Sequence, residues 1–165
     1  MERSYLFNIE KYKYIKSCTK DNCCILCSIS GGECGVENLL LHKTALTAVT
    51  VNLYPYNPGH LMIFPLRHIE HYTEYSVEEA ADIHYLTSKS IEFLDKEFNP
   101  LGYNVGYNIG LESGASIRHI HQHIVPRYKN EQGFMDILSG TRIIVNDPQE
   151  VHGRLKDYFL GISKS

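Results

Sequence analysis

The stretch RHIHQHIVPR, residues 118–127, places a histidine at every second position: His119, His121 and His123. Such alternation is typical of a β-strand, in which side chains two residues apart point to the same face and lie roughly 6.6 Å apart. We therefore expect a strand over residues 119–126, with the three imidazoles along one of its faces.

Three uses of such a row of imidazoles are consistent with the residues. The row can be a polar strand face in water. It can bind a metal ion through two neighbouring histidines, although convergence of all three is strained and the next acidic residue, Glu131, lies beyond the expected strand end. It can also be catalytic: one ring nitrogen of His121 donates to a backbone carbonyl, which leaves the other nitrogen as a nucleophile. Flanking imidazoles would then stabilise charge on a phosphoryl group.

The residues around the row supply groups for the catalytic interpretation. The preceding stretch NIGLESGASIR contains glycines that allow close backbone approach and two hydroxyl groups: Gly110, Gly114, Ser113 and Ser116. Arg118 and Arg127 bracket the row. They would help to attract an anion, although either arginine alone is more typical of a surface charge.

The strand patterns outside the row predict a mostly antiparallel sheet. The β-branched stretch LTAVTVNL, residues 46–53, is followed by the turn residues YPYNPG and then by HLMIFPL, residues 60–66. This arrangement indicates two strands joined by a loop. YNVGYNIG, residues 103–110, is a further predicted strand.

Two helices complete the predicted fold. Ser76 and Glu79 form a capping-box pattern ahead of a long helical apolar stripe, and Asn99-Pro100 ends it. A last helix begins near Asp147-Pro148 and runs toward residue 160. Strands joined by short loops, with one long and one terminal helix, give an α+β fold.

Composition limits the classes of function. The chain has 165 residues, 43% hydrophobic and 21% charged, which suits one ordinary globular domain. The net charge of −3 argues against a general binder of nucleic-acid polymers. No apolar run is long enough for a membrane span, and the N-terminus lacks the apolar segment of a signal peptide. We therefore expect a cytoplasmic protein with no membrane partner.

The 5 cysteines cluster in the first fifth of the chain. A disulfide framework would be spread more widely, so the cluster suggests a metal site or ordinary thiols. Cys24 and Cys27 have the spacing that lets two thiolates bind one tetrahedral zinc, although a redox dithiol has the same spacing. Two further ligands would be needed.

The motif H-I-H-Q-H-I-V resembles the signature of the histidine triad (HIT) superfamily of nucleotidyl hydrolases and transferases. VNLYPYNPGHLMIFPLRH, residues 51–68, resembles the central hairpin of that superfamily. The segments NIGLESGAS, HIHQHIVPRY and GFM are most similar to its diadenosine polyphosphate phosphorylase/hydrolase-like branch. The resemblance covers residues 24–134 of a single domain 1–165. Residues 1–23 form an N-terminal segment, and residues 135–165 form a C-terminal extension.

The resemblance implies a five-stranded sheet, a homodimer and an enzyme that acts on dinucleoside polyphosphates. In that mechanism His121, between His119 and His123, attacks the α-phosphorus and forms a nucleotidyl-histidine, which water or inorganic phosphate then releases. The implied substrate contacts are Asn52 for the ribose and Asn108, Gly114, Ser116 and His123 for the phosphate. Mg²⁺ would accompany the substrate. Two alternatives are a hydrolase of nucleoside phosphoramidates or adenylylated products, and a nucleotide- or zinc-binding module without catalysis.

The resemblance also implies a structural zinc site. Zinc-containing members use a cysteine pair, a central histidine and the first histidine of the triad, which here are Cys24, Cys27, His68 and His119. Cys23 is a rival for Cys24, and His71 is a rival for His68. If His119 binds zinc, it cannot also contact phosphate, and the sequence leaves that choice open. The chain has no Trp, and Gln122 within the triad departs from the pattern of this branch.

Overall fold

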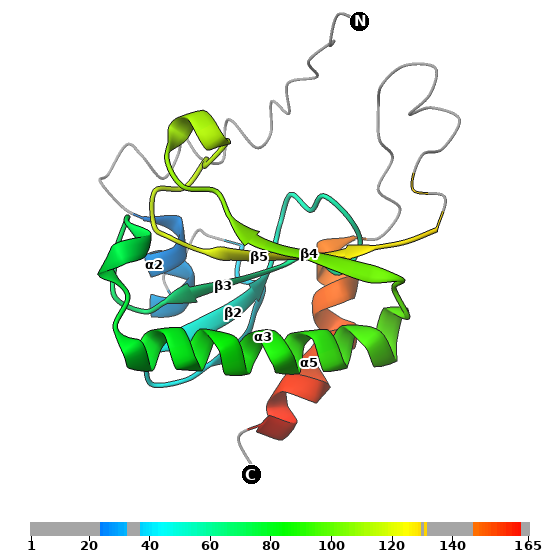
Figure 1. Ribbon diagram of the computed structural model, residues 1–165. Coiled ribbons are helices and arrows are strands. Elements are labelled where there is room, and N and C mark those ends of the chain that lie inside the picture. The colour runs from blue at the N-terminus through cyan, green and yellow to red at the C-terminus, as the bar shows by residue number, and fades with distance from the viewer. Residues whose placement is uncertain (1–23, 33–36, 130, 132–146, 163–165) are drawn as a thin grey trace, which may run out of the picture.

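An antiparallel sheet with helices on both faces is the centre of the computed structural model (Figure 1). The structure describes residues 24–32, 37–129, 131 and 147–162, so the N-terminal segment 1–23 and residues 135–146 of the proposed extension lie outside the described residues. Within them, the strand order is β1-β2-β3-β5-β4. The strands are β1 (Leu40–Lys43), β2 (Thr47–Val51), β3 (Leu61–Pro65), β4 (Gly102–Tyr107) and β5 (Gln122–Arg127). The predicted α+β fold is confirmed.

The long helix α3 (Val77–Phe98) begins and ends where the sequence predicts. The Ser76 side chain accepts a hydrogen bond from the backbone N–H of Glu79, and the Glu79 carboxylate accepts one from the N–H of Ser76. At the other end Asn99 takes a left-handed conformation with φ 45°. Figure 1 shows this helix crossing one face of the sheet.

The remaining helices are α5 (Pro148–Ile162), α2 (Ile25–Gly31) and the short 3₁₀ turns η1 (Tyr72–Glu74) and η2 (Leu111–Ser113). The C-terminal helix was predicted and contacts β1 and α3. The helix α2 was not predicted, because its seven residues are too short for a clear periodic pattern. None of the helices in the described part of the chain is long and apolar enough to cross a membrane.

Both faces of the sheet are buried at β3, which explains its continuous apolar sequence. Leu61 and Ile63 belong to the main core, which α3 and α5 cover. Met62 and Phe64 point to the other face, where they pack with Ile25 and other residues of α2. The short helix α2 therefore closes the second face of the sheet.

The strand that carries the histidine row is shorter than predicted. It begins at Gln122, so His119 and His121 precede it, and the expectation that all three histidines lie on the strand is wrong. The last ladder pair between β3 and β5 is Ile63 with Gln122. The ladder stops because β3 ends at Pro65, which has no N–H to donate. The other predicted strand, over residues 103–110, likewise ends early, at residue 107.

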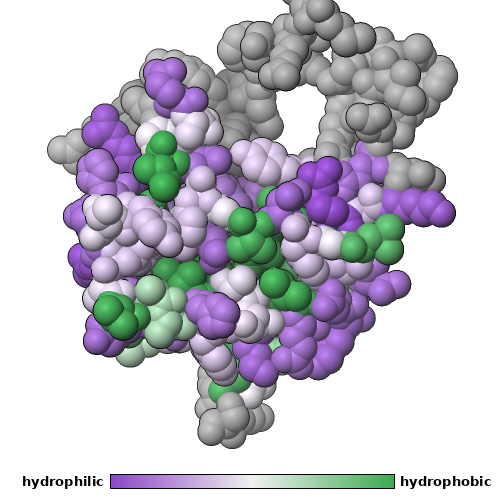
Figure 2. All heavy atoms as spheres, viewed as in Figure 1, coloured by the Kyte–Doolittle hydropathy of each residue, from purple (hydrophilic) through white to green (hydrophobic). Residues whose placement is uncertain are grey.

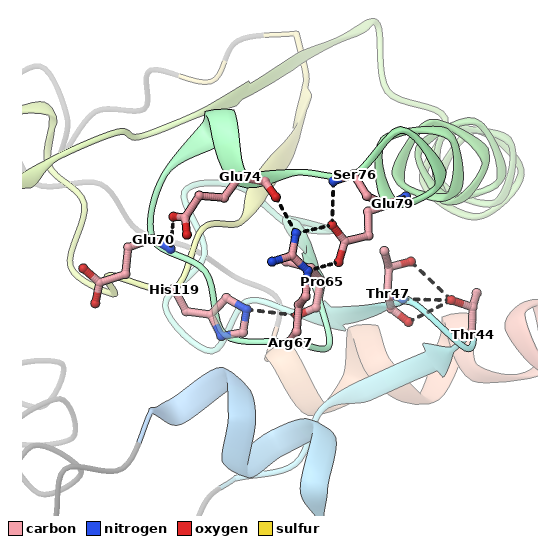
Figure 3. Close-up of polar contacts among 9 residues, drawn as sticks. All are labelled: Thr44, Thr47, Pro65, Arg67, Glu70, Glu74, Ser76, Glu79 and His119. Atoms are coloured by element: carbon pink, nitrogen blue, oxygen red, sulfur yellow. Dashed lines mark hydrogen bonds and ion pairs between the residues drawn. The ribbon is translucent and has the colours of Figure 1, made fainter.

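An ion pair fixes the segment that follows β3 against the start of α3 (Figure 3). The Arg67 guanidinium donates from Nε and Nη2 to the two carboxylate oxygens of Glu79, at 2.6 and 2.8 Å, and also to the backbone carbonyl of Glu74. Glu79 is buried, and its bond with Arg67 holds the pKa of that carboxyl below its usual range. These contacts therefore hold the segment between β3 and α3 in one position relative to the start of α3.

The turn before β3 contains a glycine that cannot be replaced without strain. Gly59 has φ 79°, and a Cβ there would lie 2.9 Å from Leu94 Cδ2 and 3.3 Å from Pro126 Cγ. We expect Gly59→Ala to lower the free energy of unfolding by about 2–4 kcal/mol, through left-handed strain and crowding together. Gly32→Ala is the matched control, because Gly32 has φ 72° but open space around it. Urea denaturation should show the smaller loss for Gly32→Ala, and equal losses would contradict the packing around Gly59.

Candidate functional site

A narrow hollow of about 40 Å³ brings together residues that are far apart in the sequence. The five residues that the resemblance assigns to substrate binding all line it: Asn52, Asn108, Gly114, Ser116 and His123. His121 lines the same hollow, and His119 is not among its lining residues. The rings of His121 and His123 meet edge to face, with centroids 4.7 Å apart.

The ring of His121 is held by a backbone carbonyl. Its Nδ1 lies 2.8 Å from the carbonyl oxygen of His119. A carbonyl can only accept a hydrogen bond, so Nδ1 carries the hydrogen and the neutral ring keeps its lone pair on Nε2. The side chain is 4% exposed. This is the arrangement that the catalytic interpretation of the histidine row requires.

The ring of His123 has the opposite tautomer, because His60 imposes it. The backbone N–H of Tyr56 donates to His60 Nδ1 over 3.0 Å, so neutral His60 carries its hydrogen on Nε2. That nitrogen lies 2.9 Å from His123 Nδ1, which therefore accepts. His123 is left with a hydrogen on Nε2, so the Asn108 amide nitrogen, which lies 3.5 Å from that atom, does not donate to it. His60 is fully buried and supports the ring of His123 from behind the hollow.

The rim of the hollow is a loop with two glycines in the left-handed region. Gly110 and Gly114 have φ 84° and 87°, and the turn η2 lies between them. Gly114 and Ser116 line the hollow, whereas the Ser113 hydroxyl donates to the carbonyl of Gly110 at 2.7 Å and turns away from it. Of the two candidate hydroxyl groups, that of Ser116 is the one that lines the hollow.

The other end of the hollow is apolar. It is formed by α2, β3 and the loops that follow β2 and precede β5, with the lining residues Ile25, Ile29, Leu53, Met62 and Ile117. The sequence missed the contribution of α2, and the only signal for it was the spacing of Ile25, Leu26 and Ile29. Tyr54 and Tyr56 also line the hollow, and the Tyr56 ring stacks on His60 with centroids 4.9 Å apart.

A second group of side chains lies on the far side of His119. The ligand atoms of Cys24, Cys27, His68 and His119 all lie within 4.8 Å of one another. His119 Nδ1 is 3.4 Å from the Cys24 sulfur and 3.5 Å from the Cys27 sulfur. His68 Nδ1 is 3.5 Å from the Cys27 sulfur. This set has the residues that the resemblance named, and Cys23, the rival for Cys24, lies outside the described residues.

The tautomer of His119 suits it to metal binding. Its Nε2 lies 2.9 Å from the carbonyl of Pro65 (Figure 3). Nε2 therefore carries the hydrogen, and the lone pair on Nδ1 faces the two thiols. Burial, assisted by the nearby His68, lowers the pKa of His119 to about 4. The ring is therefore neutral near pH 7, as a metal ligand must be. His119 belongs to the cysteine cluster and not to the hollow.

The arginines that bracket the row differ in their surroundings. Arg127 pairs with Glu131, with Nη2 2.6 Å from a carboxylate oxygen, and its Nη1 donates to the Asn104 side chain at 2.9 Å. Arg118 does not line the hollow. Neither arginine therefore contacts the hollow that contains His121.

Known proteins are similar to this chain in sequence and in fold. Residues 36–130 match the family model described as HIT domain. An AP-4-A phosphorylase from Mycobacterium tuberculosis is 37% identical over 109 residues, which is 66% of this chain and 56% of that protein. A bis(5'-nucleosyl)-tetraphosphatase [asymmetrical] from Schizosaccharomyces pombe is 26% identical over 125 residues, 76% of this chain and 65% of that protein. The match thus spans between half and two thirds of the length of these curated relatives.

A solved structure has the same architecture. The zinc-bound histidine triad family protein from Mycobacterium smegmatis superposes with a TM-score of 0.68 at 20% identity, covering 86% of this chain and 96% of that one. The family model covers more than half of the chain and includes the whole histidine row. The chain belongs to the HIT domain family.

Proposed function

We propose that the protein is an enzyme that cleaves dinucleoside polyphosphates, such as diadenosine tetraphosphate, through a covalent intermediate on His121. The observation that carries this proposal is the orientation of the His121 ring: the carbonyl of His119 leaves its lone pair on Nε2, and the ring lines a hollow with Asn108, Ser116 and His123, which can donate hydrogen bonds to phosphate. The names of the mycobacterial phosphorylase and the fission-yeast tetraphosphatase support the substrate class.

The first step forms a bond between His121 Nε2 and the α-phosphorus. The bond from that phosphorus to the bridging oxygen breaks, and the leaving nucleoside polyphosphate takes the electron pair. The ring becomes a cation, which its Nδ1–H bond to the His119 carbonyl stabilises. Hydrogen-bond donors of His123 and Ser116 would hold the phosphoryl oxygens, as an oxyanion hole does.

The second step returns His121 to its starting state. Water, which gives up a proton to the solvent, or inorganic phosphate attacks the same phosphorus. The phosphorus–nitrogen bond breaks, and the electron pair returns to Nε2. Water yields a nucleoside monophosphate, and phosphate yields a nucleoside diphosphate. Asn52 would contact the ribose, with the base in the apolar end of the hollow. Mg²⁺ would enter with the polyphosphate and offset its charge.

Hydrolysis of nucleoside phosphoramidates is a second candidate. An adenosine 5'-monophosphoramidase from Schizosaccharomyces pombe that is 33% identical over 110 residues of this chain supports it. The same nucleophile would act, and only the leaving group would differ. A nucleotide-binding module without catalysis would bind nucleotide in the same hollow and release no product.

An assay of phosphate dependence separates these functions. Incubation with diadenosine tetraphosphate and Mg²⁺ should yield AMP and ATP if water is the acceptor, or ADP and ATP if the reaction requires inorganic phosphate. His121→Asn should lower the rate by at least about 10³-fold, because it removes the nucleophile. Product formation followed by chromatography measures both effects.

Two outcomes would contradict the proposed mechanism. The first is wild-type protein that binds the dinucleotide and forms no product, which favours the phosphoramidate hydrolase or the binding module. The second is a His121→Asn variant with near-normal rates. Circular dichroism should show that this variant is folded, so that the loss of rate is chemical.

We further propose that Cys24, Cys27, His68 and His119 hold a structural zinc ion. The support is the donor set: two thiols and two imidazoles within 4.8 Å, the ligand types that tetrahedral zinc prefers. The second nitrogen of His119 is held by the Pro65 carbonyl, and that of His68 lies 3.5 Å from a Glu70 carboxylate oxygen. Such outer contacts orient the ligands of metal sites. A zinc ion there would hold α2 against the segment that carries His119.

Metal analysis tests the zinc site. Purified protein should contain about one zinc per chain, and Cys27→Ser or His68→Gln should lose it, because either change removes one of four ligands. His71→Gln is the matched control, since His71 was the rival ligand and lies outside the cluster of ligand atoms among the described residues. Zinc retained in His68→Gln but lost in His71→Gln would reverse the assignment.

We also propose a homodimer that forms through β4. This strand lies at the edge of the described sheet, and exposed edges pair readily with another chain. Val105 and Leu101 are 43% and 75% exposed there. Figure 2 shows hydrophobic residues among hydrophilic ones on the face where β4 and α3 lie.

Sedimentation equilibrium tests the dimer. The wild-type mass should be about twice the 18.9 kDa of one chain. Val105→Lys should shift the mass toward the monomer, because it places charges at the pairing edge. A wild-type protein that stays monomeric at tens of micromolar would rule out this interface.

A further inference from the structure

We propose that a second hollow, beside the first, binds the leaving nucleoside polyphosphate; this inference rests on the proposed function. The second hollow encloses about 330 Å³ and lies over β4 and β5. It shares Tyr56, Asn108 and His123 with the first hollow, whereas His121 lines only the first. The two spaces therefore meet beside the position where a reacting phosphorus would lie.

The sheet itself creates the second hollow. Gly106 pairs with His123, Asn104 with Val125 and Gly102 with Arg127, so these residues share one face of the sheet. Gly106 presents no side chain next to His123, and a Cβ built there meets no atom within 4 Å. Because this side chain is missing, the second hollow has the form of a trough that starts at His123 and follows β5 toward Arg127. We call it the trough below.

The position of the nucleophile indicates what the trough holds. The residues that line the first hollow are those proposed to contact the base, the ribose and the α-phosphate. In a displacement at phosphorus the leaving oxygen departs on the side opposite the nucleophile. The rest of a dinucleoside polyphosphate must therefore pass away from His121. His123 and Asn108 line both the first hollow and the trough, so a polyphosphate chain that passes these two residues enters the trough.

The side chains along the trough suit a nucleoside polyphosphate. At the near end, His123 carries its hydrogen on Nε2, and Asn108 adds an amide. At the far end, roughly 13 Å along the strand, Arg127 supplies a guanidinium. Glu131 and Asn104 hold that guanidinium in place, with Nε 2.9 Å from Glu131 Oε1 and Nη1 2.9 Å from Asn104 Oδ1. Glu131 offsets part of the charge, so neutral amide and tyrosine groups would supply much of the binding.

Equilibrium binding tests the trough without turnover. In a His121→Asn background, we would measure the dissociation constants of AMP, which needs only the first hollow, and of diadenosine tetraphosphate. Gly106→Val fills the trough with a residue that strands accept readily. Diadenosine tetraphosphate should then bind more weakly, whereas AMP should not. The ratio of the AMP dissociation constant to the diadenosine tetraphosphate dissociation constant should therefore fall by about tenfold or more. Gly102→Val is the matched control, because it lies on the same strand and face, with open space, but does not line the trough.

A second variant covers the case in which Gly106→Val does not fold. Asn104→Asp keeps the oxygen that accepts from Arg127 and adds a negative charge to the trough. It should lower the same ratio severalfold. The inference would be overturned if the folded variants had the same ratio of dissociation constants as the His121→Asn background protein. Failure of the proposed function would look different, because wild-type protein would then form no product from diadenosine tetraphosphate.

Discussion

The hydrogen bond from His121 Nδ1 to the carbonyl of His119 is the interaction on which the proposed chemistry depends. An imidazole in water exchanges between two tautomers, and only one of them puts the lone pair on Nε2. The carbonyl removes that freedom. It also ties the proposed nucleophile to His119, whose ring belongs to the cysteine cluster. A metal ion bound there would thus stabilise the backbone that orients the nucleophile, without contacting the substrate.

The five residues from Pro65 to Ile69 connect both sites to the sheet. Pro65 ends β3, and its carbonyl fixes the His119 ring. Arg67 fastens the segment to α3, His68 joins the cluster, and the Ile69 carbonyl accepts from the N–H of residue 120. Pro65 has no N–H to donate, so the hydrogen-bond ladder between β3 and β5 does not continue past Gln122. The residues before β5 therefore do not pair regularly with β3. This irregular backbone lets neighbouring histidines serve different sites, which a continuous strand with all three rings on one face would not allow.

Much of the fold could be predicted from the sequence, since its signals are local. The capping box at Ser76, the β-branched run of β2 and the proline at 148 each mark an element by themselves. The bounds of the histidine strand could not be predicted, because they depend on Pro65 some fifty residues away. The role of His119 was open for the same reason: two sites compete for one ring, and only its distance to the thiols decides between them. The trough beyond His123 depends on strand register, which the sequence does not specify.

The tautomers of the triad are the most direct test. Long-range proton–nitrogen correlation spectra of nitrogen-15-labelled protein near pH 7.5 distinguish protonated from unprotonated ring nitrogens. The hydrogen-bond geometry predicts that His121 carries its hydrogen on Nδ1, whereas His123 carries it on Nε2. A spectrum in which His121 is protonated on Nε2 would contradict the account, because the nitrogen that must attack phosphorus would then have no lone pair.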